Sequence, residues 1–145
     1  MKVNFKKLNE NAKAPSYGSA FAAGADLCSA ENENTVIPAG KTVFIHTGIS
    51  MEIPEGYAGL IFARSGLACK KGLAPANKVG VVDSDYRGEI MVALHNHSLE
   101  DVTIEVGERI AQISLVPYLT ADFIETDTLS DTVRGDGGFG STGRK

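Results

Sequence analysis

The chain has 145 residues, 43% of them hydrophobic and 22% charged, with a formal net charge of −4 at pH 7. This length and composition are typical of one soluble domain with a single core. The acidic balance disfavours a protein that coats DNA or RNA, because such proteins neutralise many phosphates with a broad basic surface. An anionic ligand would have to be met locally, by specific arginines or backbone amides.

Signals for secretion or membrane insertion are weak in this sequence. Cys28 and Cys69 are too few for a disulfide framework. Residues 1–15 lack the apolar core of a signal peptide, and no run approaches the roughly 20 apolar residues of a membrane span. We therefore expect a reducing cytoplasmic location and no contact with a membrane.

Short β-rich segments separated by turns make up the first half of the chain. Residues 3–8 are predicted to form a first strand, and residues 14–24 a loop of small residues. Residues 42–53 form a long β-branched run. The turn at residues 54–56 would lead into a return strand at 57–62, so this pair predicts a meander.

The second half continues the pattern with one interruption. Residues 67–73 could form a short helix, with an irregular loop as the alternative. Residues 78–82 and 90–94 flank a turn of Asp, Ser and Gly, which is typical of a β-hairpin. Strands at 102–106 and 110–118 would follow. Many short strands at even spacing predict an all-β fold, a jelly-roll-like β-barrel or sandwich.

The end of the chain has a different composition. Apolar residues become rare after residue 125, and residues 134–143 contain five glycines, one arginine, one aromatic residue and a Ser-Thr pair. We expect a β-rich core at residues 1–125 and a flexible C-terminal arm at 126–145. A disordered terminus is the plainer interpretation, although this composition would also suit a phosphate chain and a flat ring.

Two motif matches do not hold. Residues 135–140 satisfy the G-x-G-x-x-G pattern, but no strand closely precedes them and no helix can follow, so a dinucleotide-binding fold is not indicated. His95 and His97 would share one face of a strand and could offer two imidazoles to a metal. No Cys or acidic residue at ligand spacing completes a zinc set around them.

The most informative stretch is GVVDSDYRGE at residues 80–89. Asp83 lies where the first hairpin strand is predicted to end. A carboxylate held by a sheet on one side and free on the other can act as an oriented base. Asp83 and Asp85 could equally be turn formers, so the choice depends on the other motifs.

Five segments in order carry a resemblance to a known family. They read AGADL at 23–27, ARSGLA at 63–68, GVVDSDYRGE at 80–89, GERIAQ at 107–112 and RGDGGFGSTG at 134–143. This set resembles the five-motif pattern of the trimeric dUTP pyrophosphatases (dUTPases). The departures are Ala25 where an aromatic is common, Ala63 where a proline is common, and Val82 in place of an isoleucine. None of them removes a group that would do chemistry.

The resemblance implies hydrolysis of dUTP to dUMP and pyrophosphate, by attack of water on the α-phosphorus with Mg²⁺ spanning the triphosphate. This activity would limit uracil incorporation into DNA and supply dUMP for thymidylate synthesis. Asp83 would orient and deprotonate the water. The substrate phosphates would hold the Mg²⁺ directly. Asp26 is a candidate for its outer shell or for holding the Asp83 region, with a loop cap as the alternative.

Base and sugar recognition are implied for the hairpin. Tyr86 would lie under the deoxyribose and leave no room for a 2′-hydroxyl, with ordinary packing as its alternative role. Asn77 would assist from the preceding turn. The uracil would be read by main-chain groups, contributed by Gly80, Val81, Val82, Ile90 and Met91.

Phosphate contacts are implied for the other motifs. Arg64, Ser65 and Gly66 would meet the phosphates, and Gln112 would add a contact, whereas Arg109 could be a phosphate ligand or a structural ion-pair partner. The arm would close over the substrate. Its implied contacts are Arg134 on the γ-phosphate, Phe139 stacked on the uracil, and Gly140, Ser141 and Thr142 along the phosphates.

The family resemblance also implies a homotrimer, with sites between subunits and the arm reaching another subunit's site. Two alternatives stay open. A dCTP deaminase of the same fold would need a glutamate base, for which Glu89 lies close enough on the hairpin. A non-catalytic nucleotide-binding protein would be expected to lack one of the catalytic groups, and none is missing.

Overall fold

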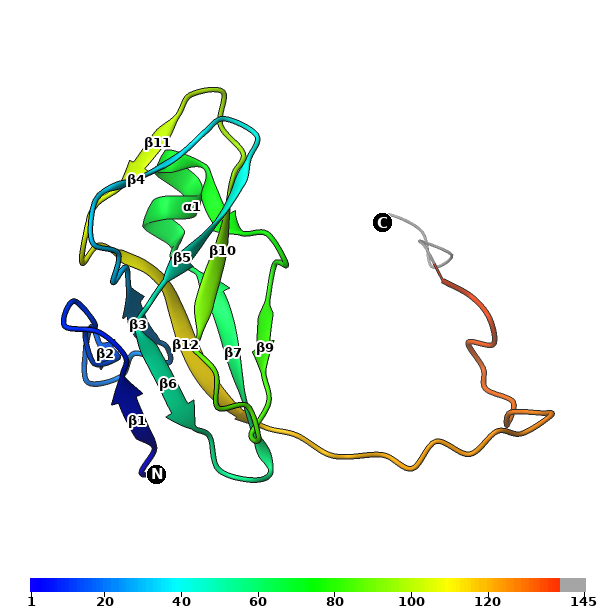
Figure 1. Ribbon diagram of the computed structural model, residues 1–145. Coiled ribbons are helices and arrows are strands. Elements are labelled where there is room, and N and C mark those ends of the chain that lie inside the picture. The colour runs from blue at the N-terminus through cyan, green and yellow to red at the C-terminus, as the bar shows by residue number, and fades with distance from the viewer. Residues whose placement is uncertain (139–145) are drawn as a thin grey trace.

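The computed structural model describes residues 1–138 of the chain, and the fold is nearly all β (Figure 1). The first half contributes β1 (Asn4–Lys7), β2 (Ser16–Tyr17), β3 (Ala25–Cys28), β4 (Thr35–Ile37), β5 (Thr42–His46), β6 (Ile49–Glu52) and β7 (Tyr57–Ala63). The second half contributes α1 (Ser65–Lys71), β8 (Leu73–Pro75), β9 (Gly80–Val82), β10 (Met91–Asn96), β11 (Val102–Ile104) and β12 (Arg109–Pro117).

The strands form a sandwich of antiparallel sheets. The largest sheet has the order β2-β3-β12-β7-β9, and the second has the order β5-β10-β8. Two-stranded sheets join β1 to β6 and β11 to β4. Leu27, Ile45, Leu94 and Ile104, which come from three of the sheets, are all at most 1% exposed in one shared core. The predicted all-β sandwich is confirmed, and within residues 1–138 the sheets stay open rather than closing into a barrel.

Burial along β10 shows why these residues form a strand. Val92, Leu94 and Asn96 are buried, whereas the residues between them are exposed or half-buried, as expected where alternate side chains face the core. Asn96 is a polar core residue whose amide nitrogen donates to the Ile37 and Glu100 carbonyls. These bonds tie the end of β10 to β4.

The predicted strand at residues 42–53 is interrupted. β5 ends at His46 and β6 begins at Ile49. Gly48 adopts a φ of +64°, a left-handed conformation that ends the extended chain. A side chain at Gly48 would also overlap Ala12, since a Cβ there would lie 2.7 Å from the Ala12 Cβ. β-Branched composition gave no sign of this corner.

The predicted meander is wrong. β7 pairs with β12 and β9, while β6 pairs with β1. The turn at Gly56, with a φ of +81°, therefore leads the chain from one sheet into another. A turn signal marks a change of direction but does not determine which strand becomes the hydrogen-bonding partner.

The predicted hairpin is also wrong, because its two strands do not pair with each other. β9 pairs with β7, and β10 pairs with β5 and β8, so the two strands belong to different sheets. Lys78 has a φ of +66° and lies in the turn before β9 rather than in the strand. The connection from Asp83 to Ile90 is long for a tight hairpin and crosses between the sheets.

Other predicted elements are confirmed. The candidate helix is α1, which Gly72 ends in a left-handed conformation with its amide bonded to the Leu67 carbonyl. The predicted strands at 102–106 and 110–118 correspond to β11 and β12. The small-residue loop at 14–24 contains the short strand β2.

The chain leaves the sandwich after β12. Residues 118–138 form no helix or strand and run away from the sheets (Figure 1). Leu119, Phe123 and Ile124 in this segment are at least 86% exposed. The division into a core at 1–125 and an arm at 126–145 stays a prediction. Residues 1–138 contain no helix with the length and hydrophobicity that crossing a bilayer requires.

Candidate active site

A pocket of about 240 Å³ lies between β9 and β10, and we call it the β9–β10 pocket. It exists because these strands diverge into different sheets instead of pairing. The predicted catalytic residue Asp83 lines it, and so do all the predicted uracil and sugar contacts: Asn77, Gly80, Val81, Val82, Tyr86, Ile90 and Met91. Sequence reasoning missed Phe44 of β5, an exposed wall residue that no motif marks.

The walls of this pocket include backbone without a strand partner. β9 is an edge strand that pairs only with β7 among the described strands. On β10, the pairing with β8 covers Leu94–Asn96 and stops short of Met91. Peptide N–H and C=O groups fixed in order along such edges can distinguish the donors and acceptors of a ligand.

Asp83 lies at the end of β9 and opens toward solvent. Its side chain makes no hydrogen bond to any residue in the described part of the chain, whereas its carbonyl accepts from the Tyr86 amide at 3.2 Å. Arg87 donates to the Ser84 and Tyr86 carbonyls at 2.7 and 2.9 Å, which braces the loop. Asp83 also lines a neighbouring pocket with Asp85.

Tyr86 is held against a glycine. Its hydroxyl donates to the Glu89 carbonyl at 3.0 Å. A Cβ on Gly88 would lie 2.9 Å from Cε2 of the Tyr86 ring, so any side chain there would displace the ring. Gly88 is thus part of the site, although its place in an Asp-Gly-rich turn suggested only a turn former.

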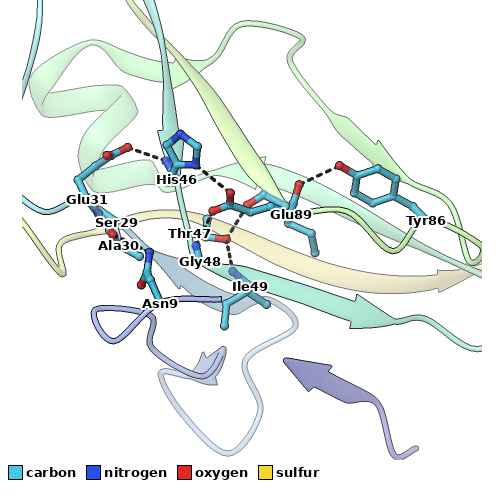
Figure 2. Close-up of polar contacts among 11 residues, drawn as sticks. Asn9, Ser29, Ala30, Glu31, His46, Thr47, Gly48, Ile49, Tyr86 and Glu89 are labelled. Carbon is cyan, nitrogen blue, oxygen red and sulfur yellow. Dashed lines mark hydrogen bonds and ion pairs between the residues drawn. The ribbon is translucent and has the colours of Figure 1, made fainter. Parts of the chain in front are cut away.

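Glu89 is fully engaged within the protein, as Figure 2 shows. One carboxylate oxygen accepts from the Gly48 amide at 2.7 Å and the other pairs with His46 Nδ1 at 2.8 Å. The hydrogen bond to Glu89 raises the pKa of His46, against a smaller opposing effect of burial. A carboxylate held in this way is poorly placed to be the base of a deaminase.

A second pocket, which we call the arginine pocket, gathers the remaining core motifs. It has a volume of about 240 Å³ and is lined by Asp26, Arg64, Ser65, Gly66, Arg109 and Gln112, with Gly18, Ala22 and Gly24. These residues come from the loop before β3, from β3, from the start of α1 and from β12. The first, second and fourth motifs therefore meet here.

Asp26 organises this pocket. Its two oxygens accept from Arg64 Nε at 2.8 Å and from an Arg109 guanidinium nitrogen at 3.1 Å. The Asp26 side chain is 10% exposed, whereas those of Arg64 and Arg109 are 26% and 55% exposed. A buried carboxylate thus holds two arginines with their outer faces in solvent, where they can meet an anion.

Strand register explains this arrangement. Gln112 lies opposite Asp26, and an irregularity between Arg109 and Ala111 shifts the pairing of β12 with β3. The Gln112 amide donates to the Ala63 carbonyl at 3.0 Å, next to Arg64. A Cβ at Gly24 would lie 2.8 Å from Gln112 Oε1, so a side chain there would displace the Gln112 amide.

The two pockets share no lining residue. Within one chain, the Asp26 carboxylate bonds Arg64 and Arg109 and lines only the arginine pocket of these two, so its role in holding the Asp83 region stays a prediction. Among residues 1–138, Arg134 bonds only Gly137: its Nε donates to the Gly137 carbonyl at 2.8 Å, and its carbonyl accepts from the Gly137 amide at 3.2 Å. The predicted contacts Phe139, Gly140, Ser141 and Thr142 lie outside the described residues.

The histidine pair lies at the end of β10. The rings of His95 and His97 meet edge to face with centroids 4.4 Å apart, and His95 Nδ1 hydrogen-bonds the Thr42 hydroxyl at 2.9 Å. Among residues 1–138, no group of three or more His, Cys, Asp or Glu side chains forms a metal site.

The sandwich fold, the backbone-lined pocket with its carboxylate and the arginine pocket together define a protein suited to a phosphorylated ligand. The dUTPase family profile matches residues 10–143. The chain therefore belongs to the dUTPase family, the dUTP diphosphatases.

Individual relatives agree with this assignment. Proteins named deoxyuridine 5'-triphosphate nucleotidohydrolase are 49% identical over 145 residues in Hydrogenobaculum sp. and 50% identical over 144 residues in Nautilia profundicola. The first match covers all of both chains, and the second covers 99% of this chain and 100% of the relative. The structure of a Staphylococcus bacteriophage 80alpha dUTPase mutant with dUpNHpp has a TM-score of 0.90 at 29% identity, covering 98% of each chain.

Proposed function

We propose that this protein hydrolyses dUTP to dUMP and pyrophosphate by attack of water on the α-phosphorus. The observation that carries the proposal is the exposed Asp83 carboxylate at the end of the β9–β10 pocket, free of hydrogen bonds to residues 1–138. The names of the relatives and the dUpNHpp in the bacteriophage enzyme support the same substrate. Removing dUTP in this way would limit uracil in DNA and supply dUMP for thymidylate synthesis.

The proposed reaction needs positioning and charge neutralisation more than covalent chemistry. Asp83 orients a water toward the α-phosphorus and takes its proton. The backbone edges of β9 and β10 read the uracil, and the Tyr86 ring excludes a 2′-hydroxyl. Both pocket walls are parts of the sandwich, so the reacting groups are held by sheet rather than by loop alone.

Magnesium fits this arrangement as an ion carried by the substrate. Mg²⁺ prefers oxygen ligands and retains several waters. The triphosphate oxygens can therefore be its main direct ligands, without a direct bond to the protein. When bound, it would neutralise phosphate charge. Both Asp26 oxygens already accept bonds from arginines, so we assign Asp26 to holding Arg64 and Arg109. Its place in an outer shell of the ion stays a prediction.

The arginine pocket is the proposed phosphate site, with Arg64, Ser65, Gly66 and Gln112 as contacts and Arg109 as a neighbour of Arg64. Since the two pockets share no residue, we propose that a second copy brings its arginine pocket beside the β9–β10 pocket. A homotrimer would complete three such sites. The arm at residues 126–145 would cross to another subunit and close the site with Arg134 and Phe139.

The location proposed for this enzyme is the cytoplasm. Cys28 and Cys69 are both free thiols, as a reducing compartment maintains them. The deaminase alternative is not favoured, because the one glutamate near the pocket is bound to His46 and Gly48.

Base selection provides the first test. We expect dCTP and dTTP to be hydrolysed at least about a hundredfold less efficiently than dUTP, because cytosine leaves buried polar groups unpaired and the thymine methyl has no space. The measurement is pyrophosphate release from each deoxynucleoside triphosphate, with and without Mg²⁺. Ammonia release from dCTP would support the deaminase, and comparable kcat/KM values would contradict the backbone readout.

The Asp26 bridge provides the second test. Asp26→Asn should raise KM for dUTP about tenfold, because Arg64 and Arg109 lose the charge that orients them. It should also lower the free energy of unfolding by about 1–2 kcal/mol, less than for a wholly buried pair because both arginines are partly exposed. Urea unfolding and steady-state kinetics check both effects.

The matched control is Glu108→Gln, which changes a half-buried carboxylate that pairs with Lys71 at 3.0 Å, accepts from the Glu105 amide and lies outside both pockets. Its KM should stay within about twofold of wild type. Equal kinetic effects of the two substitutions would contradict the role assigned to Asp26.

A further inference from the structure

We infer that Glu89 is a positioning residue for sugar selection: its carboxylate, held by His46 and the Gly48 amide, fixes the loop that presents Tyr86. This inference rests on the proposed function, in which the Tyr86 ring lies under the deoxyribose. Glu89 itself touches no reacting atom in this scheme and acts through Tyr86.

Glu89 links the corner between β5 and β6 to Tyr86, through its side-chain carboxylate and its main-chain carbonyl (Figure 2). Its side chain is 21% exposed and accepts from the Gly48 amide at 2.7 Å and from His46 Nδ1 at 2.8 Å. Its own carbonyl accepts the Tyr86 hydroxyl at 3.0 Å. These bonds therefore fix the position of the Tyr86 ring relative to the corner between β5 and β6.

That corner is firmly anchored. The His46 carbonyl accepts from the Ala30 amide at 2.8 Å, and the His46 amide donates to a Glu31 carboxylate oxygen at 2.8 Å. The Gly48 carbonyl accepts from the Leu8 amide at 2.7 Å. Bonds from three directions make the corner a fixed point rather than a mobile turn.

The loop after Glu89 is fastened to the same corner. The Ile90 amide donates to the Ile49 carbonyl at 2.8 Å, and the Thr47 hydroxyl donates to the Ile90 carbonyl. Tyr86 itself is 45% exposed and has Glu89 and Gly88 as its close contacts on this side. A ring can exclude a 2′-hydroxyl only if it cannot move aside, so sugar selection depends on this chain of contacts.

Charge adds a dependence on pH. The charged groups that face His46 among the described residues are Glu89 and Glu31, from two separate loops. Hydrogen bonding to Glu89 raises the pKa of His46, while burial acts in the opposite direction. A raised pKa means that the ion pair is fully present below the ordinary histidine value and is lost as pH rises through the raised value. Tyr86 is held most firmly on the acidic side of neutrality.

The test compares Glu89→Ala with Glu89→Gln. Alanine removes both side-chain bonds, so the ratio of kcat/KM for dUTP over UTP should fall about tenfold. Glutamine can still accept from the Gly48 amide and donate to neutral His46, so its ratio should stay within about twofold of wild type. Glu52→Gln is the matched control, because among residues 1–138 the exposed Glu52 side chain bonds only Asn4.

A second readout uses the pH profile. Deoxyuridine carries no group that titrates near neutrality, so its inhibition constant reports protein groups alone. In wild type, this inhibition constant should rise about two- to threefold between about pH 6 and 8, because deoxyuridine binds more weakly once the ion pair is lost. It should not change with pH in Glu89→Gln and His46→Gln, which lack the ion pair. Thermal unfolding and oligomeric state verify that each variant is folded.

An unchanged dUTP to UTP ratio in Glu89→Ala overturns the inference. Equal losses for both substrates would leave the ratio unchanged in this way and would mean that Glu89 only stabilises the fold. A pH profile in Glu89→Gln identical to wild type overturns the charge dependence. If wild type fails to hydrolyse dUTP, the proposed function falls, but the ratio of uridine to deoxyuridine dissociation constants, measured by equilibrium binding, still tests Glu89.

Discussion

Asp83→Asn should lower kcat for dUTP by about 10²–10⁴-fold, while the dissociation constant for dUTP changes by less than about threefold. An amide has the shape of the carboxylate but cannot take the proton of the attacking water. The Asp83 side chain is exposed and bonds no residue between 1 and 138, so its replacement breaks no contact of the fold. Loss of turnover without loss of binding is therefore the signature of a base.

The measurement is single-turnover hydrolysis with enzyme in excess, combined with titration of a non-hydrolysable dUTP analogue. Asp85→Asn is the matched control, since Asp85 belongs to the same loop but lines only the neighbouring pocket. Its kcat should stay within about twofold of wild type. A single-turnover rate for Asp83→Asn equal to that of wild type would remove Asp83 from the reaction.

Deletion of residues 134–145 should leave a folded protein of unchanged oligomeric state with kcat/KM lowered by about 10²–10³-fold. The fold should survive because β12 ends at Pro117 and, within the described part of the chain, Arg134 bonds only the nearby Gly137. Activity should not survive, because the deleted residues include the proposed contacts to the γ-phosphate and the uracil face. The transition temperature should change by less than about 2 °C.

The control is removal of residues 144–145 alone, which leaves the glycine-rich motif intact. Phe139→Ala separates stacking on the base from the phosphate contacts of the arm, and should raise KM with a smaller effect on kcat. Undiminished kcat/KM after the longer deletion would contradict the lid.

Strand positions could be predicted from the sequence, whereas strand partners could not. A run of mostly apolar residues marked β12, and turn residues marked the ends of most strands. Pairing depends on contacts between distant segments, so the meander of residues 42–62 and the hairpin around Asp83 were assigned wrong partners. The left-handed Gly48 that separates β5 from β6 has no distinctive neighbours in the sequence.

The candidate site shows the same limit. Motif order predicted Arg64 and Gln112, but their placement around Asp26 depends on the register of β12 against β3 and on the irregularity next to Arg109. The partnership of Glu89 with His46 joins residues 43 positions apart. No periodicity in the sequence indicates such a pair. The roles of Glu89, His46 and Gly88 could therefore be recognised only from the fold.

The free edge of β9 has a consequence for handling the protein. β9 has three residues and pairs with one neighbour among the strands of residues 1–138, so its other side offers these residues' backbone groups to an extended peptide. A uracil bound there would occupy those backbone groups in place of a further strand. Enzyme concentrated without nucleotide should therefore be most prone to edge-to-edge association, and a dUTP analogue in storage buffers should suppress it.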